Sequence, residues 1–139
     1  MERPRHVQVI ATTAEGTRTA LAEAKRLSSR VDPAPIVLLV PHIVSSSRPL
    51  ESPQETTHLA AQYKHLAAAA GIDATVRVCL CRGYGEALRW MVGERAVIVI
   101  GGRRRWWWPT TAQWMARDLK RAGHSVVFAV VGQDGARMT

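Results

Sequence analysis

Residues 101–108 are two glycines followed by three arginines and three tryptophans. Of all segments of the chain, this one has the residue types best suited to binding a ligand. The glycines allow a sharp turn or a close approach of the backbone to a ligand. Arginine side chains offer forked donors that match phosphate oxygens, and tryptophan rings offer flat surfaces for stacking a base. A threonine that follows can cap a helix whose first amides attract anions. The segment predicts an anion site made of Gly101, Gly102, Arg103, Arg104, Arg105, Thr110 and Thr111.

The same segment also fits a plainer interpretation. The glycines fit a simple turn, the arginines fit a solvated basic surface, and the tryptophans fit a cover for the edge of a sheet. Neither G-x-x-x-x-G-K-[ST] nor G-x-G-x-x-G occurs there, which counts against the common phosphate-loop and dinucleotide folds. The direction in which Trp106, Trp107 and Trp108 point is left open.

Residues with catalytic or metal-binding chemistry are scattered. His42 is the best placed of the five histidines, but a lone histidine at the end of a strand is more often structural. Cys79 and Cys81 stand two apart in a strand-like run, lack the partners of a zinc site and fit buried, reduced thiols. With neither a serine elbow nor a carboxylate pair in the sequence, we expect no enzyme and no metal site.

Length and composition indicate one domain spanning residues 1–139, with a core at about 5–131 and frayed ends. The net charge of +8 and the isoelectric point near 10.7 favour binding of nucleotides, nucleic acids or acidic partners. No apolar run reaches the roughly 20 residues of a membrane span, and a secretory segment is not evident, so we expect a cytoplasmic protein without membrane contact.

Strand and helix patterns alternate along the chain, which predicts a three-layer, doubly wound α/β fold with a five-stranded parallel sheet and helices on both faces. Fully apolar runs mark interior strands, whereas 74–81 alternates and suits an edge strand. The expected strands are 6–11, 36–40 (ending near Pro41), 74–81, 96–100 and 125–131, and the expected helices are 17–31, about 59–70, about 87–91 and 110 or 111 to 122.

Ligands of open parallel sheets bind beyond the carboxyl ends of the strands. The relevant loops are 12–17, 41–47 and 101–110, which add Thr12, Thr13 and His42 to the candidate residues.

Over residues 5–131 the chain resembles the universal stress protein family. The resemblance rests on four stretches, 9–21, 37–44, 83–88 and 97–103, which are similar to the first strand and turn of that family, its second strand, the entry of its third helix and the strand before its nucleotide loop. It implies the sheet order 3-2-1-4-5, a homodimer through the last strand, and a stress-linked role without a defined reaction. The second strand contributes Val40 to the candidate site.

Some members of this family bind ATP, but two departures count against standard ATP binding. Gly101 matches the first glycine of their loop, while Arg104 replaces the second and Thr110 comes several residues too early. Thr12 stands where those members have an acidic residue. We therefore assign no cofactor, and we keep ATP or another nucleotide as a possible ligand.

Three other functions fit the sequence less well. Binding of nucleic acid or an acidic partner by the basic aromatic loop is the main alternative. A flavodoxin-like FMN site has weak support from the hydroxyl-rich stretch 12–17, but its glycine spacing is wrong. A response-regulator receiver is excluded, because the acidic residues it needs after its first and third strands are missing.

Overall fold

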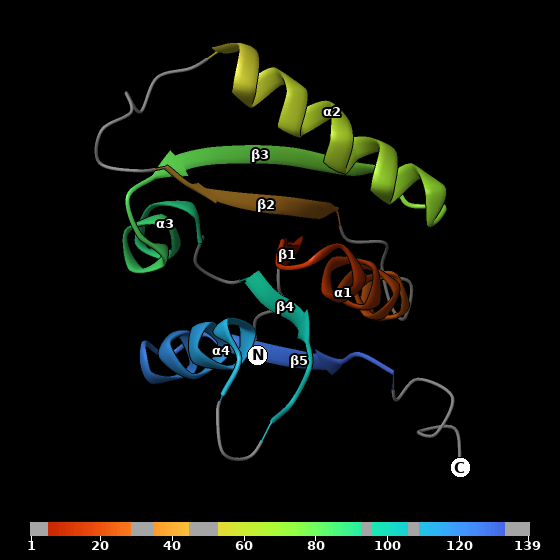
Figure 1. The fold of residues 1–139 in the computed structure, drawn as a ribbon. Coiled ribbons are helices and arrows are strands. Elements are labelled where there is room, and N and C mark those ends of the chain that lie inside the picture. The colour runs from red at the N-terminus through yellow and green to blue at the C-terminus, as the bar shows by residue number, and fades with distance from the viewer. Residues whose placement is uncertain (1–5, 29–34, 45–52, 93–95, 106–108, 133–139) are drawn as a thin grey trace.

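The computed structural model describes residues 6–28, 35–44, 53–92, 96–105 and 109–132. All neighbouring strands are parallel, and the sheet has the order β3-β2-β1-β4-β5 (Figure 1), which confirms the predicted α/β class and strand order. The elements are β1 (His6–Ile10), α1 (Ala14–Ser28), β2 (Ile36–Ile43), α2 (Pro53–Ala69), β3 (Ala74–Cys81), α3 (Tyr84–Met91), β4 (Ala96–Gly102), α4 (Thr111–Arg121) and β5 (Ser125–Val130).

Helices cover both faces of the sheet, α1 and α2 on one side and α3 and α4 on the other (Figure 1). Successive side chains of a strand point to opposite faces, so each strand supplies both layers of the core. Val9, Leu38 and Val99 pack on the α1 and α2 side. Leu39 and Ile98 pack on the α3 and α4 side. The three-layer prediction is therefore confirmed.

Strand β2 continues to Ile43, so the predicted end near Pro41 is wrong. The amide of Ala11 donates to the carbonyl of Leu39, which shows that Leu39, and Pro41 two residues later, face the β1 side. Since β1 ends at Ile10, the missing amide of Pro41 costs the sheet no hydrogen bond. On the other side β2 keeps its pairing with β3 through Ile43 and Cys81.

Strand β4 is also longer than predicted, because Gly101 and Gly102 are its last two residues and pair with Ala129 and Val130 of β5. They belong to the sheet and not to a loop or turn. A glycine pair resembles a turn in sequence, whereas here it lies where two helices approach the strand closely.

Helix α1 begins at Ala14, three residues before the predicted start, because Thr13 caps it: its Oγ1 accepts the amide of Gly16 at 3.0 Å. Helix α2 begins at Pro53, a residue suited to a first helical position. Gly71, with φ +76°, follows its end as predicted. The predicted end of the first helix near Val31 lies outside the described residues, as does the tail predicted to be frayed (132–135) apart from its first residue, Gly132.

Strand β3 is an edge strand, as predicted, with Thr75 and Arg77 exposed. Strand β5 forms the other edge. Among the described helices, none is long and apolar enough to cross a membrane.

Candidate functional site

A cavity of about 370 Å³ opens at the carboxyl ends of β1 and β4, where the sheet order and the sequence both place a ligand site. It brings together seven of the predicted residues, which come from segments far apart in the chain: Thr12, Thr13, Gly101, Gly102, Arg103, Thr110 and Thr111. Three further residues line it that the sequence did not indicate: Tyr84, Ala112 and Met115.

The first wall of the cavity is the start of α1, which is fixed by threonine hydroxyls. Thr12 Oγ1 donates to the carbonyl oxygen of Gly101 at 2.7 Å and thereby ties the β1–α1 turn to the end of β4. Thr17 Oγ1 accepts the amide of Thr12 at 3.0 Å and donates to the carbonyl of Thr13 at 2.7 Å. Thr12 and Thr13 are therefore held as parts of the wall before any ligand binds.

The second wall is the start of α4, where Thr110 and Gln113 form a capping box. Thr110 Oγ1 accepts the amide of Gln113 at 3.3 Å, and Gln113 Oε1 accepts the amide of Thr110 at 2.8 Å. Thr110 Oγ1 also donates to the carbonyl of Arg103 at 3.0 Å. The amides of Thr111 and Ala112 are left without a partner inside the helix, since the first turn of a helix offers none.

The two glycines of β4 form the floor, where helices press on the strand from both faces. A Cβ atom on Gly101 would overlap the carbonyl oxygen of Gly16 in α1. A Cβ atom on Gly102 would lie 2.6 Å from the Cβ of Ala112 in α4. Close packing of the helices therefore explains why both positions are glycine. From the sequence, we had expected them to let the backbone come close to a ligand.

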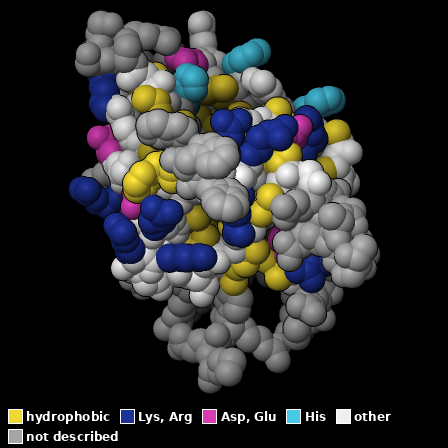
Figure 2. Space-filling model, turned by 60° about the horizontal axis from the view of Figure 1, so that its bottom comes forward, with side chains coloured by type: hydrophobic (Ala, Val, Ile, Leu, Met, Phe, Trp, Pro, Cys, Tyr) yellow, Lys and Arg dark blue, Asp and Glu magenta, His cyan; other side chains and the backbone are white. Residues whose placement is uncertain are grey.

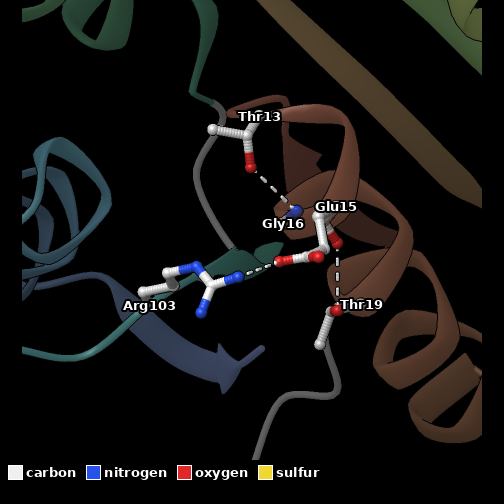
Figure 3. Close-up of polar contacts among 5 residues, drawn as sticks. All are labelled: Thr13, Glu15, Gly16, Thr19 and Arg103. Carbon is white, nitrogen blue, oxygen red and sulfur yellow. Dashed lines mark hydrogen bonds and ion pairs between the residues drawn. The ribbon is translucent and has the colours of Figure 1, made fainter. Parts of the chain in front are cut away.

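Among the described residues, Arg103 is the cationic side chain that lines the cavity, and it already has a partner. Its Nη2 lies 2.9 Å from Oε1 of Glu15 in the first turn of α1, and both side chains are more than half exposed. Figure 3 shows the guanidinium reaching from the end of β4 toward this carboxylate, beside the Thr13 cap. The pair leaves the cavity edge close to neutral.

The other two predicted arginines do not line this cavity. Arg104 stacks on the ring of Phe128 in β5, with 5.6 Å from Cζ to the ring centroid. Arg105 is exposed, and its backbone exchanges two hydrogen bonds with the amide side chain of Gln113. The predicted cluster of three arginines on one ligand is therefore not formed. Trp106, Trp107 and Trp108 lie outside the described residues.

The two candidates of the second strand also lie away from the cavity. Val40 is buried in the core layer under α1 and α2. His42 Nε2 lies 2.8 Å from Oε1 of Glu55, near the start of α2. His42 was assigned to the site on the assumption that β2 ended near Pro41, whereas β2 continues to Ile43, so His42 lies within the strand and its side chain meets Glu55.

The two cysteines are free thiols, as predicted, but only Cys81 is buried; Cys79 is partly exposed, because β3 is an edge strand. Burial raises the pKa of the Cys81 thiol from 9.0 to about 11, and the neighbouring Cys79 adds to this rise. Within the part of the chain that the structure describes, no three His, Cys, Asp or Glu side chains are grouped to hold a metal ion.

Comparison with solved structures identifies the architecture. A universal stress protein crystallised in complex with cAMP superposes with a TM-score of 0.53 over 89% of this chain and 97% of its own, at 14% sequence identity. The chain has the fold of a universal stress protein. No protein-family model matches the sequence. Curated proteins show no significant sequence match either.

In this universal stress protein-like fold, three helices begin near the cavity. Tyr84, the first residue of α3, lines it beside the starts of α1 and α4. The similarity of residues 83–88 to the third-helix entry of the family was the signal that could have drawn Tyr84 into the site. Ala112 and Met115 are on the buried stripe of α4, which sequence periodicity alone reads as core.

Proposed function

We propose that this chain is a non-enzymatic, universal stress protein-like domain of the cytoplasm that binds a nucleotide with a single phosphate in the cavity between α1, β4 and α4. The observation that carries the proposal is the convergence of two capped helix N-termini, at Thr13 and Thr110, on one cavity. Helix N-termini present free amides and a partial positive charge, which together favour an anion.

The charge at the cavity favours a ligand with one phosphate over a triphosphate. Arg103 is the cation of its lining, and Glu15 already neutralises it. Arg104 and Arg105 have their contacts elsewhere. A triphosphate would bring about four negative charges to a place where helix amides and one shared arginine must balance them.

The size and the remaining walls fit a mononucleotide. The cavity of about 370 Å³ is at the small end of the range of ligand pockets, roughly 300–1,000 Å³. Tyr84 offers a half-exposed ring for a base, and Met115 and Ala112 supply an apolar wall. The complex of the related fold with cAMP supports a cyclic mononucleotide as the first ligand to test.

Calorimetric titration with cAMP, AMP and ATP tests the proposal, with variants at Thr111. Thr111→Glu places a carboxylate on the first residue of α4, where it stabilises the helix by about 0.3–1 kcal/mol and repels a bound phosphate. We expect this variant to melt at the temperature of the parent or a few degrees above it and to lose at least about tenfold in affinity. Thr111→Gln, of similar shape without the charge, is the matched control and should bind as the parent does.

Three results would contradict the proposal. If none of the three nucleotides gives heat, the chain does not bind a nucleotide of this kind. If Thr111→Glu and Thr111→Gln bind with equal affinity, the ligand does not lie at the start of α4. Tighter binding of ATP than of cAMP and AMP contradicts the single-phosphate assignment.

We further propose that two copies associate through β5. Among the described strands, β5 has a neighbour on one side only, so alternate backbone groups along its other side face outward. A homodimer of this kind is also what the family resemblance implies.

A further inference from the structure

A second hollow, separate from the nucleotide cavity, lies between α4 and the β5 edge of the sheet. Its volume is about 270 Å³, and its lining consists of three cations, one aromatic ring and two smaller side chains: Arg104, Gln113, Ala116, Arg117, Lys120 and Phe128. We call it the α4–β5 groove. Figure 2, in which this side of the molecule comes forward, shows Lys and Arg side chains gathered among hydrophobic ones.

Helical spacing explains how the groove is formed. Gln113, Arg117 and Lys120 follow one another at intervals of four and three residues, so they share one stripe of α4. The stripe next to it, with Ala112 and Ala116, is buried in the core. The cations therefore line the margin where α4 leaves the sheet, opposite Phe128 of β5.

The cations of the groove are not neutralised by any carboxylate among the described residues. Among the residues that the structure describes, Arg104, Arg117 and Lys120 form no ion pair, and no carboxylate lines the hollow. Arg103, one residue before Arg104, differs in this respect because it is paired with Glu15. An uncompensated row of cations in a concave surface attracts a polyanion.

Two arginines of this surface stack on aromatic rings. Arg104 lies over Phe128 at 5.6 Å, and Arg117 lies over Trp114 at 5.1 Å, measured from Cζ to the ring centroid. Trp114 is 49% exposed, which is unusual for the largest apolar side chain. Guanidinium planes and exposed indole rings are the surfaces on which unpaired bases stack.

We propose that the α4–β5 groove binds single-stranded nucleic acid, with phosphates on Arg104, Arg117 and Lys120 and a base against Trp114. An acidic peptide would pair with the cations, but it has no base to stack on the arginine planes or on the exposed indole ring of Trp114. A duplex keeps its bases stacked inside, so it too would use only the cations. The combination of unpaired cations with an exposed ring thus favours an unpaired strand.

The test is fluorescence anisotropy of a labelled single-stranded oligonucleotide of mixed sequence, measured with the full chain over a range of salt concentrations. Three phosphate contacts predict a slope of log K against log salt of about −2, since each contributes about −0.7. In Arg117→Gln/Lys120→Gln we expect the slope to fall to about −0.7 and the affinity to fall at least about tenfold.

The matched control is Lys64→Gln/Arg77→Gln, which removes the same two charges from exposed positions of α2 and β3 at the far edge of the sheet. We expect this control to bind within about twofold of the parent. Trp114→Ala should weaken binding roughly tenfold and leave the salt slope unchanged, whereas Trp114→Phe should keep most of the affinity. All of these positions are on the surface, and melting curves check that the variants fold.

Three outcomes would overturn the assignment. Equal losses in the groove variant and the control mean that net charge alone attracts the strand. If duplex DNA binds as tightly as the single strand, the aromatic rings do not contribute to binding by stacking on bases. A groove variant that changes the mass of the protein in light scattering, with unchanged oligonucleotide affinity, assigns the groove to a second copy of the chain.

Discussion

Gly101 and Gly16 meet where the backbones of β4 and α1 touch. A methyl group on Gly101 would overlap the carbonyl of Gly16, and one on Gly16 would lie 2.5 Å from the carbonyl oxygen of Gly101. Neither residue has a positive φ, so their role is to leave space and not to adopt a special backbone conformation. The contact sets how closely α1 lies on the sheet.

Gly101→Ala should therefore destabilise the protein by about 3 kcal/mol or more, because backbone and not a flexible side chain stands in the way. Gly85→Ala is the control: this exposed helical position has nothing within 4 Å of a new Cβ, and alanine there should stabilise by about 0.5–1 kcal/mol. Urea unfolding measures both. Equal stabilities of the two variants would refute the packing role of Gly101.

The raised pKa of Cys81 predicts how stability depends on pH. The unfolded thiol ionises near its ordinary value of 9.0, whereas the folded thiol keeps its proton to about 11. Between these values the unfolded chain binds fewer protons, so stability is complete below pH 9 and falls as pH rises toward 11, by up to about 1.4 kcal/mol per pH unit from this thiol. Unfolding at several pH values should show a smaller fall in Cys81→Ala. An identical fall in both proteins would contradict the prediction.

At the scale of elements, the start of α4 both stabilises the helix and forms a wall of the cavity. The Thr110 and Gln113 side chains complete the capping box, and Thr110 also holds the carbonyl of Arg103. Thr110→Ala should cost about 1 kcal/mol of stability in urea unfolding, while Thr110→Ser keeps the hydroxyl and should cost little. If the serine variant loses as much as the alanine variant, the hydroxyl bonds are not what stabilises the helix start.

Strands and helices were predicted well where one chemical pattern dominates. Runs such as 96–100 are apolar throughout because both faces of their strands are buried. Ends were predicted less well, since they depend on neighbours: Pro41 stays in β2 because β1 has already ended, and Gly102 stays in β4 because β5 continues beside it. Periodicity within one segment contains no information about the length of the strand beside it.

The position of the candidate site could be predicted from the sequence, whereas the contacts of its side chains could not. Topology places Thr12 and Gly101 at one end of the sheet, and the structure joins them by a hydrogen bond. The contacts of the arginines depend on which ring or carboxylate lies within reach, and no spacing rule foresees that Arg103 meets Glu15 while Arg104 meets Phe128.

At the scale of the whole molecule, the strand order came from the family resemblance, because alternating strands and helices fit several doubly wound orders. That order puts β5 at an edge, where the proposed dimer would form.

Light scattering over a range of concentrations should give twice 15.3 kDa. Val131 donates its amide to Gly102 of β4, so the amides of Val126, Phe128 and Val130 point the other way. Val126→Pro removes one of these outward donors and is expected to shift the mass toward the monomer. A mass of 15.3 kDa for the parent chain at every concentration would rule out the dimer.

The floor of the cavity between α1, β4 and α4 is main chain, since Gly101 and Gly102 contribute no side chains to it and the helices on either face prevent any from being added. Substitution can therefore reshape the rim, for example at Tyr84, Arg103 or Thr111, but not the floor. Among descendants of this chain, a change of ligand would be expected to arise at those rim positions, while the two glycines stay fixed whatever the ligand is.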